Sequence, residues 1–307
     1  MSETWDVVIV GGGPAGLSAA IYSGRALRKT LVLERKVFGG QIVESDIIEN
    51  YPGTGEPLVP YDLMERFTKQ VEKYGVTMES DEVTALRRSE TGWQVTTEGG
   101  EIEARAVIFA TGSTHRHLGV PGEKELLGRG ISVCATCDAP FFKDRQVAVL
   151  GGGDTALAEA LHLAKFAARV TIVHRRDELR AERILQDRAR RHERIAFRWN
   201  SLVTRFVGDQ KLAAIELRDK VSGQVEQVAF DGAFLAIGTV PNTALLSGLT
   251  RLDEGGYVLT DISLKTDVPG LFVAGEVIAG NHRQVAISTG MGVQAALSCE
   301  AYLAARE

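Results

Sequence analysis

The hydrophobic residues near the start of the chain form two short continuous runs instead of an alternating pattern. These runs, residues 7–10 (VVIV) and 30–33 (TLVL), are separated by residues 17–28, whose sequence favours a helix. Continuous apolar runs of this length are typical of strands that a parallel sheet buries on both faces. The pattern therefore predicts a strand, a turn, a helix and a second strand over residues 6–34.

The turn of this unit is rich in glycine, and its second strand ends in an acidic residue. Glycine lets the backbone approach a pyrophosphate at the positive end of a helix, and a carboxylate at the strand end accepts hydrogen bonds from two ribose hydroxyls. The combination predicts a dinucleotide site for a ribose without a phosphate, as in FAD. The predicted contact residues are Gly11, Gly13, Pro14, Ala15, Gly16 and Glu34.

A second copy of the unit occurs in the middle of the chain with a different end. An apolar run at 146–150 leads into a glycine turn, a helix to about residue 167 and a strand at 170–173. A histidine and several arginines follow this strand, and cations suit the doubly negative 2′-phosphate of NADPH. A solvated basic face is the other interpretation, and it is preferred for the arginines at 183–194. The predicted contacts are Gly153, Asp154, Thr155, His174, Arg175, Arg176 and Arg180.

Three further apolar runs end in glycine or just before an acid, and they indicate where the chain passes between domains. They cover residues 106–112, 232–238 and 270–276, and turn signals at Pro121 and Pro241 follow the first two. We therefore expect an α/β protein with two Rossmann-like dinucleotide-binding domains of the three-layer ββα type.

The predicted domain limits follow from the places where the chain passes between domains. An FAD-binding domain is predicted over residues 1–115 and 245–307, with an NADPH-binding domain, residues 116–244, inserted into it. Residues 81–106 and 201–231 alternate between apolar and polar positions around glycine turns, which predicts small antiparallel units that serve as scaffold.

Two of the three cysteines lie close together between the two glycine turns. Cys134 and Cys137 are separated by two residues, and Asp138 follows at once. A dithiol at this spacing can form a disulfide or supply a reactive thiolate, and the carboxylate is placed to carry a proton to or from the sulfur. Half of a zinc site is the alternative, but the remaining thiol, Cys299, lies far away in an apolar segment. We therefore predict a redox-active pair and no metal site.

The overall composition limits the function further. Hydrophobic residues make up 44% of the chain, charged residues 24%, and the net charge is −5. These values favour a globular protein and give no indication of a nucleic-acid or membrane partner. We expect neither a signal peptide nor a transmembrane helix, and the cysteine usage is typical of the cytoplasm.

At this point the motifs taken together resemble one family, the low-molecular-weight thioredoxin reductases, over essentially the whole chain. The matching segments are residues 11–16, 38–41, 49–53, 110–112, 134–138, 151–156, 174–180, 237–242 and 283–284. The resemblance implies FAD and NADPH as cofactors, a homodimer, and a thioredoxin or thioredoxin-like protein as partner. It adds the FAD contacts Gly40, Gln41, Asn50, Thr111, Gly112, Gly275, Glu276, Arg283, Gln284 and Val285.

The resemblance also implies separate roles for the two cysteines. Cys137 would accept electrons from the flavin, Cys134 would attack the partner disulfide, and Asp138 would be the acid. The inserted domain would rotate about hinges near 113–120 and 241–246 so that the dithiol and the nicotinamide reach the flavin in turn.

Two other hypotheses stay open, and departures from the family pattern motivate the first of them. Glu276 replaces the usual aspartate and Ala139 the usual glycine after Asp138. One alternative keeps the flavin and the cysteines but takes electrons from ferredoxin, or oxidises dithiols with oxygen. A non-enzymatic redox sensor or scaffold is a third hypothesis, supported only by the general rule that one fold hosts many functions.

Overall fold

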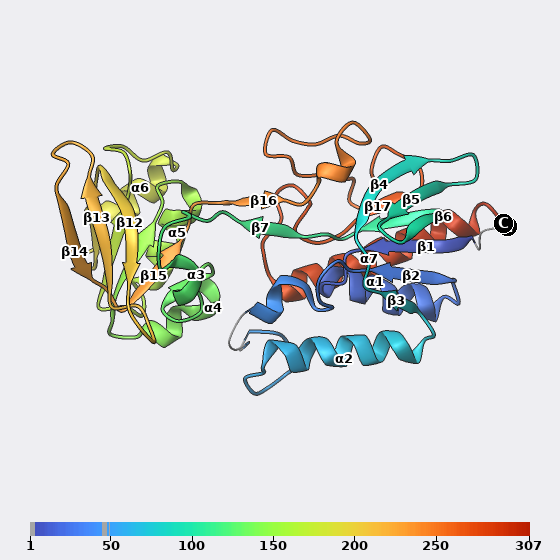
Figure 1. The fold of residues 1–307 in the computed structure, drawn as a ribbon, viewed down its shortest axis with the longest axis horizontal. Helices are drawn as coiled ribbons and strands as arrows, with labels where there is room; N and C mark the ends of the chain where they lie inside the picture. The colour runs from blue at the N-terminus through green and yellow to red at the C-terminus, as the bar shows by residue number, and fades with distance from the viewer. Residues whose placement is uncertain (1–3, 45–47, 49) are drawn as a thin grey trace. The chain divides into compact units, whose positions relative to one another are not determined.

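The computed structural model describes residues 4–44, 48 and 50–307. Glu49, part of the matching segment 49–53, and residues 1–3, which were considered for a signal peptide, lie outside the described residues. The chain divides into two compact units, residues 1–114 with 240–307 and residues 115–239, called here unit 1 and unit 2. Each unit is built around its own parallel sheet (Figure 1).

Unit 1 contains a seven-stranded sheet in the order β3-β2-β1-β6-β5-β4, with β17 paired to β6. In its parallel part, β2, β17 and the last four residues of β1 are buried, as expected of strands that are covered on both faces. The antiparallel part, β4 to β6, is formed by the segment predicted to be a hairpin unit. The strands are β1 (Trp5–Val10), β2 (Thr30–Leu33), β3 (Thr77–Glu79), β4 (Val83–Arg88), β5 (Trp93–Thr97), β6 (Gly100–Phe109) and β17 (Leu271–Val273).

The helices of unit 1 are α1 (Pro14–Arg25), α2 (Pro60–Lys73) and α7 (Val285–Ala304), with short turns η1 (Gly40–Glu44) and η3 (Ala244–Leu246). Helix α1 starts earlier than the predicted residue 17, because proline is favourable in a first helical turn. It ends before residue 28, because Leu27 has a left-handed backbone with φ of 60°. Helices α1 and α7 pack closely, and a Cβ at Gly292 would lie 2.0 Å from the carbonyl oxygen of Ala15.

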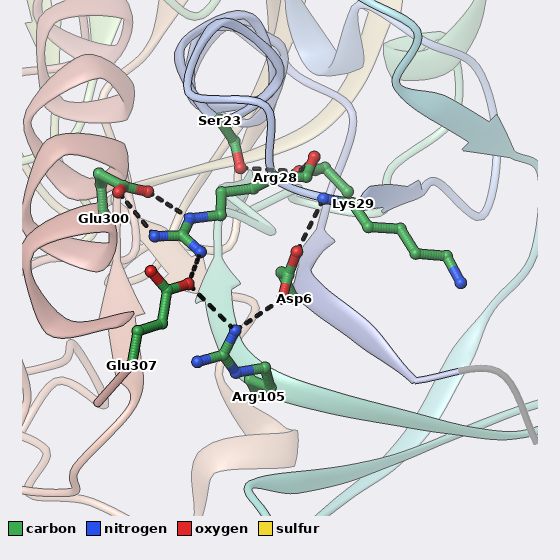
Figure 2. A network of polar contacts seen from close by, with 8 residues as sticks. Asp6, Ser23, Arg28, Lys29, Arg105, Glu300 and Glu307 are labelled. Carbon is green, nitrogen blue, oxygen red and sulfur yellow. Dashed lines mark hydrogen bonds and ion pairs between the residues drawn. The ribbon is translucent and has the colours of Figure 1, made fainter. Parts of the chain in front are cut away.

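A charged network fixes the end of α7 to the sheet of unit 1 (Figure 2). The guanidinium of Arg28, whose side chain is 12% exposed, forms two hydrogen bonds of 2.6 and 2.8 Å with Glu300 and a further one with Glu307. Arg105 contacts Asp6 at 2.9 Å and Glu307 at 3.6 Å. The network therefore holds together the end of α1, the start of β1, β6 and the final helix.

Unit 2 has three layers, as the ββα prediction requires. A five-stranded parallel sheet in the order β11-β10-β9-β15-β8 forms the middle layer. Alternate residues of β9 face opposite cores: Val147 and Val149 pack with the helices, and Ala148 and Leu150 pack with an antiparallel sheet of order β12-β13-β14. This alternation is the period of two that a strand imposes.

The elements of unit 2 have the following limits. Its strands are β8 (Ile131–Ser132), β9 (Gln146–Leu150), β10 (Arg169–Val173), β11 (Ile195–Arg198), β12 (Ser201–Val207), β13 (Ala214–Asp219), β14 (Val225–Ala229) and β15 (Gly232–Leu235). Its helices are α3 (Glu123–Leu126), α4 (Ala135–Asp138), η2 (Ala139–Phe142), α5 (Asp154–Leu163) and α6 (Arg183–Arg191).

The chain crosses between the units through two strands, β7 (Ser113–His115) and β16 (Thr239–Pro241), which pair with each other. Unit 1 resumes at residue 240, before the predicted residue 245. The physical reason is Asn242, which exchanges hydrogen bonds of 2.8 and 2.9 Å with Thr111 and donates its own N–H to the carbonyl of Gly112 at 3.0 Å. Among the helices of the described residues, none is long and apolar enough to cross a membrane.

Candidate functional site: two glycine turns and a cysteine pair

The glycine turn of unit 1 connects β1 to α1 and is packed too tightly for side chains at two positions. Gly11 has φ of 108°, and a Cβ there would lie 2.4 Å from the carbonyl oxygen of Ala110. A Cβ at Gly16 would lie 1.8 Å from the carbonyl oxygen of Gly11. Both glycines are therefore required by the close packing of helix, turn and sheet.

Gly13, at the N-cap of α1, has a different reason to be glycine. Its φ of −80° is available to any residue, and a Cβ there would have as its nearest neighbour the Cα of Gly40, 3.9 Å away. The missing side chain leaves open space in front of the first N–H groups of α1, where Pro14 occupies the first helical turn. This is the space that a pyrophosphate needs at a helix N-terminus.

Glu34 follows β2 and has its carboxylate directed to the same turn. One oxygen accepts the N–H of Gly12 at 2.8 Å, and the other accepts the N–H of Lys36 at 2.9 Å. Each carboxylate oxygen has two lone pairs, so acceptor capacity remains for ribose hydroxyls. Glu34, Gly11 and Thr111 line a cavity of about 430 Å³, together with Asn242 and residues 81–84.

The structure brings several of the predicted FAD residues together around the start of α1. A Cβ at Gly40 would lie 3.0 Å from the Cα of Gly13, and a Cβ at Gly275 would lie 3.1 Å from the Cβ of Ala15. Gln41 follows Gly40 in η1. Segments from distant parts of the sequence therefore converge on one cradle in unit 1.

A second pair of predicted residues is joined by a hydrogen bond. The amide of Asn50 donates to the side-chain oxygen of Gln284 at 3.1 Å. Gln284 is the N-cap of α7 and is flanked by the exposed Arg283 and by Val285, the first helical residue. The bond places the loop after η1 beside the start of α7.

The carboxylate of Glu276 has a partner that the sequence did not indicate. The hydroxyl of Ser113 donates to it at 2.6 Å, and Ser113 is buried. Ser113 and Asn242 are the residues near this cradle that sequence analysis missed. For Asn242 the signal was its position directly after the turn proline Pro241, whereas Ser113 is separated from Glu276 by most of the chain and gave no signal.

The glycine turn of unit 2 connects β9 to α5. Gly151 has φ of 156°, and a Cβ there would lie 2.4 Å from the carbonyl oxygen of Ala236. Gly153, the N-cap of α5, has φ of −100°, and a Cβ added to it would meet no atom within 4 Å. Thr155, in the first turn of α5, is exposed. The open N-terminus that a pyrophosphate needs therefore recurs in unit 2.

His174 and three arginines follow β10 at this turn. His174 is buried with 6% of its surface exposed, and a Cβ at Gly152 would lie 2.3 Å from its ring. Burial and the nearby arginines 176, 180 and 175 lower the pKa of His174 below its usual value. Arg175, Arg176 and Arg180 are exposed. The exposed donors are therefore three guanidiniums, which fit a phosphate dianion, whereas the ring of His174 is buried beside the turn.

Asp154, predicted as a nucleotide contact, has a protein partner. Its Oδ1 atom accepts the N–H of Glu182 at 2.7 Å. The N–H of Arg180 donates to the carbonyl of Gly152 at 2.8 Å. Both bonds attach the arginine loop, residues 175–182, to the glycine turn.

Cys134 and Cys137 form a disulfide, with their Cα atoms 5.4 Å apart. The pair follows β8 at the carboxyl edge of the sheet in unit 2, the edge at which the glycine turn also lies. Cys134 is the N-cap of α4, and its sulfur accepts the N–H of Cys137 at 3.2 Å. Cys134, Cys137 and Asp138 are partly exposed, which a reactive pair requires.

The remaining residues around the pair are structural or accessible. Ala139 is fully buried, so its Cβ is part of the core of unit 2. Phe142 packs edge-on against Phe234 at 5.2 Å, whereas Phe141 is half exposed. Cys299 is buried in α7, and burial raises the pKa of its thiol. Among the described residues no cluster of His, Cys, Asp or Glu could hold a metal ion.

Comparison with known proteins gives one consistent result. The family model described as pyridine nucleotide-disulphide oxidoreductase matches residues 5–292. A protein named thioredoxin reductase from Treponema pallidum (strain Nichols) is 42% identical over 303 residues, which cover 99% of this chain and 98% of that protein. Another of the same name from Streptomyces clavuligerus is 44% identical over 308 residues, with 99% and 96% covered. The solved structure of thioredoxin reductase from Streptococcus pyogenes MGAS5005 is similar at a TM-score of 0.94 and 37% identity, covering 99% of this chain and 100% of that one.

Proposed function

Because this chain belongs to the pyridine nucleotide-disulphide oxidoreductases, and among them to the low-molecular-weight thioredoxin reductases, we propose that it reduces the disulfide of a thioredoxin-type protein with electrons from NADPH. One observation carries the proposal. A single chain combines two open glycine turns with chemically different strand ends, Glu34 and His174, and a bonded cysteine pair, Cys134 and Cys137.

We assign FAD to unit 1 and NADPH to unit 2. In unit 1, the space at Gly13 would hold the pyrophosphate and Glu34 the ribose, with the surrounding segments at Gly40, Asn50 and Gly275 completing the cradle. In unit 2, Gly153 and Thr155 would face the pyrophosphate, and the arginine loop would face the 2′-phosphate. When bound, NADPH supplies a hydride, and FAD converts it into the electron pair that reduces a disulfide.

The cysteine pair has the geometry for disulfide exchange. Reduction of the Cys134–Cys137 bond takes two electrons and two protons and yields two thiols. The N–H of Cys137 points at the sulfur of Cys134, so it stabilises a thiolate there. We assign attack on the partner disulfide to Cys134, displacement of the resulting mixed disulfide to Cys137, and proton transfer to Asp138.

Three further features belong to the proposal. The connecting strands β7 and β16 are its hinge. The first is shorter than the predicted 113–120, and the second begins before the predicted 241–246 because Asn242 is bonded into unit 1. The active form is a homodimer. The protein works in the cytoplasm, where the environment is reducing and disulfides are mostly transient and catalytic.

The alternatives that keep the flavin but change the electron donor are not favoured. Ferredoxin-dependent reduction or dithiol oxidation gives no role to the exposed cations Arg175, Arg176 and Arg180 after β10. Those cations have a role if NADPH is the donor.

An anaerobic titration with NADPH tests the proposal. The flavin absorbance of the wild-type protein is expected to bleach, and added oxidised thioredoxin should restore it with release of thiols. In Cys137→Ser the bleaching by NADPH is expected to remain, whereas thiol production should stop. A flavin that stays oxidised under NADPH would overturn the donor assignment, and thiol production by Cys137→Ser would overturn the role of the pair.

A further inference from the structure

The loop that carries the three arginines of unit 2 is held to the glycine turn by few contacts. Residues 175–182 contain no helix or strand, and only Leu179 and Ala181 are buried. Arg175, Arg176 and Arg180 form no ion pair with a carboxylate among the residues that the structure describes. The backbone of the loop must therefore be positioned by hydrogen bonds, because three like charges do not hold one another in place.

Unit 1 shows how the corresponding loop is positioned when the strand ends in an acid. There the N–H of Gly39 donates to the carbonyl of Gly12 at 2.8 Å. Glu34 adds the second attachment, because its carboxylate accepts the N–H groups of Gly12 and Lys36. The residue that ends the strand thus fixes both the turn and the loop that follows.

Unit 2 repeats the first attachment and replaces the second with a weaker one: the ring of His174 hydrogen-bonds the backbone of Glu178 in the middle of the loop, which leaves the end at Glu182 to another partner. The N–H of Arg180 donates to the carbonyl of Gly152 at 2.8 Å, as Gly39 does to Gly12. The strand ends in His174 in place of Glu34, so no carboxylate stands at the position from which Glu34 accepts its bonds. Any carboxylate there would also repel a 2′-phosphate.

We propose that Asp154 takes over this function and is the residue that positions the arginine loop for the 2′-phosphate. Its Oδ1 accepts the N–H of Glu182 at 2.7 Å, at the far end of the loop from His174. Asp154 is itself the first residue of α5, where Gly153 leaves the N-terminus open. One side chain thereby sets the spacing between the pyrophosphate position and the guanidiniums.

This inference rests on the proposed function and reassigns Asp154, which acts through the loop and not by contact with the nucleotide. The sign of its effect separates a positioning role from a purely electrostatic one, and the exchange of the Glu182 N–H, measured without nucleotide, separates positioning from direct contact. A carboxylate acting only through its charge repels an anionic ligand, so removing it tightens binding in Asp154→Ala and Asp154→Asn alike. A carboxylate that positions the loop leaves binding weaker in Asp154→Ala, and Asp154→Asn restores most of it because the amide oxygen still accepts the bond.

The experiment measures binding of 2′,5′-ADP and of 5′-ADP to the FAD-loaded protein by calorimetry. For Asp154→Ala we expect 2′,5′-ADP to bind about three- to ten-fold more weakly, as loss of one hydrogen bond predicts, with 5′-ADP changed less than about two-fold. Asp231→Ala is the matched control, because Asp231 accepts the N–H of Gln146 at 2.9 Å in the same unit but at the opposite end of β9. An unchanged or tightened affinity of Asp154→Ala for 2′,5′-ADP would overturn the inference.

Amide hydrogen exchange separates this inference from the proposed function and covers a variant that folds poorly. The N–H of Glu182 is expected to exchange faster in Asp154→Ala than in wild type, and at the wild-type rate in Asp154→Asn and Asp231→Ala, with no nucleotide present. Equal exchange of Glu182 in all four proteins contradicts the positioning role. If wild type binds both ligands equally but the exchange pattern holds, the NADPH assignment fails while Asp154 still positions the loop.

Discussion

The two glycine turns have the same backbone arrangement and different chemistry attached to it. Gly11 and Gly151 both have positive φ, and a Cβ at either would lie 2.4 Å from a carbonyl oxygen, that of Ala110 or that of Ala236. Gly13 and Gly153 both leave the N-terminus of a helix open. The pyrophosphate position is thus built twice by backbone alone.

The difference begins where the second strand of each unit ends. Glu34 accepts two backbone N–H groups, whereas His174 is an uncharged ring packed over Gly152. The acid fits a free ribose and the ring with its arginines fits a phosphate. Under the proposed function, the comparison assigns binding of a dinucleotide to the turn and the choice between FAD and NADPH to the residues after the strand.

The largest effect is expected from Gly16→Ala, which tests whether the two turns tolerate the same side chains. The new Cβ would lie 1.8 Å from the carbonyl oxygen of Gly11, and backbone cannot move aside as a side chain can. We expect a cost of about 3 kcal/mol or more and over 100-fold weaker FAD binding. The measurement is the ratio of flavin to protein absorbance after gel filtration.

The corresponding position in unit 2 is already Ala156, so the same turn there accommodates a methyl group. Gly290→Ala is the control, because that glycine lies in α7 and a Cβ added to it would meet no atom within 4 Å. A Gly16→Ala protein that retains its full flavin content would show that the close approach in unit 1 is not required.

Much of this comparison was predictable because it depends on local sequence. The strand at 30–33 was predicted to its exact limits, and the strands at 7–10 and 170–173 are extended by one or two residues in β1 and β10. The fold class is confirmed by the similarity to solved structures, and so is the family. Hydrophobic runs and glycine spacing contain this information directly.

The contacts between distant segments could not be predicted from patterns. The bond from Ser113 to Glu276, the bond from Asn50 to Gln284 and the attachment of Asp154 to Glu182 each depend on how side chains meet after folding. The boundary at residue 240 was missed for the same reason, since it depends on what Asn242 contacts. The assignments of individual cofactor contacts stay predictions.

The next effect concerns the cations of unit 2. Replacing both Arg175 and Arg176 by alanine removes charge-assisted hydrogen bonds to a 2′-phosphate, each worth about 1.5–3 kcal/mol. Because two such bonds are lost, we expect the preference for NADPH over NADH, as a ratio of kcat/KM, to fall by about 100-fold or more. Arg183→Ala, at the start of α6, is the control on the solvated face and should leave the ratio unchanged. An equal loss in Arg183→Ala would mean that general positive charge, not the loop, provides selectivity.

A smaller effect tests how much the charged network contributes to the stability of unit 1. Arg28→Met removes the hydrogen bonds that the largely buried guanidinium of Arg28 forms with the more exposed Glu300 and Glu307 in unit 1 (Figure 2). We expect the free energy of unfolding to fall by about 1–3 kcal/mol, with earlier loss of flavin in urea. Arg25→Met, at the last residue of α1, loses an exposed hydrogen bond to Tyr74 and is expected to change little. Unchanged flavin release in Arg28→Met would show that the network does not support the FAD unit.

The smallest effect is a pH dependence confined to unit 2. Burial and the arginines hold the pKa of His174 below its ordinary value of 6.5, so the unfolded chain takes up this proton first as the pH falls. The stability of the nucleotide-free protein is therefore complete above about pH 6.5 and declines as the pH falls towards the lower folded value.

The test compares the urea midpoints of wild type and His174→Gln from pH 7.5 down to pH 5.5. His162→Gln is needed beside it, because burial and Lys165 also lower the pKa of His162 within unit 2. The urea midpoint should fall less steeply with decreasing pH in each variant than in wild type. The difference in slope between His174→Gln and wild type should become smaller when salt screens the arginines. If His174→Gln follows the wild-type curve at every pH, the ring is not held neutral over Gly152, and the contrast between the two strand ends loses its electrostatic basis.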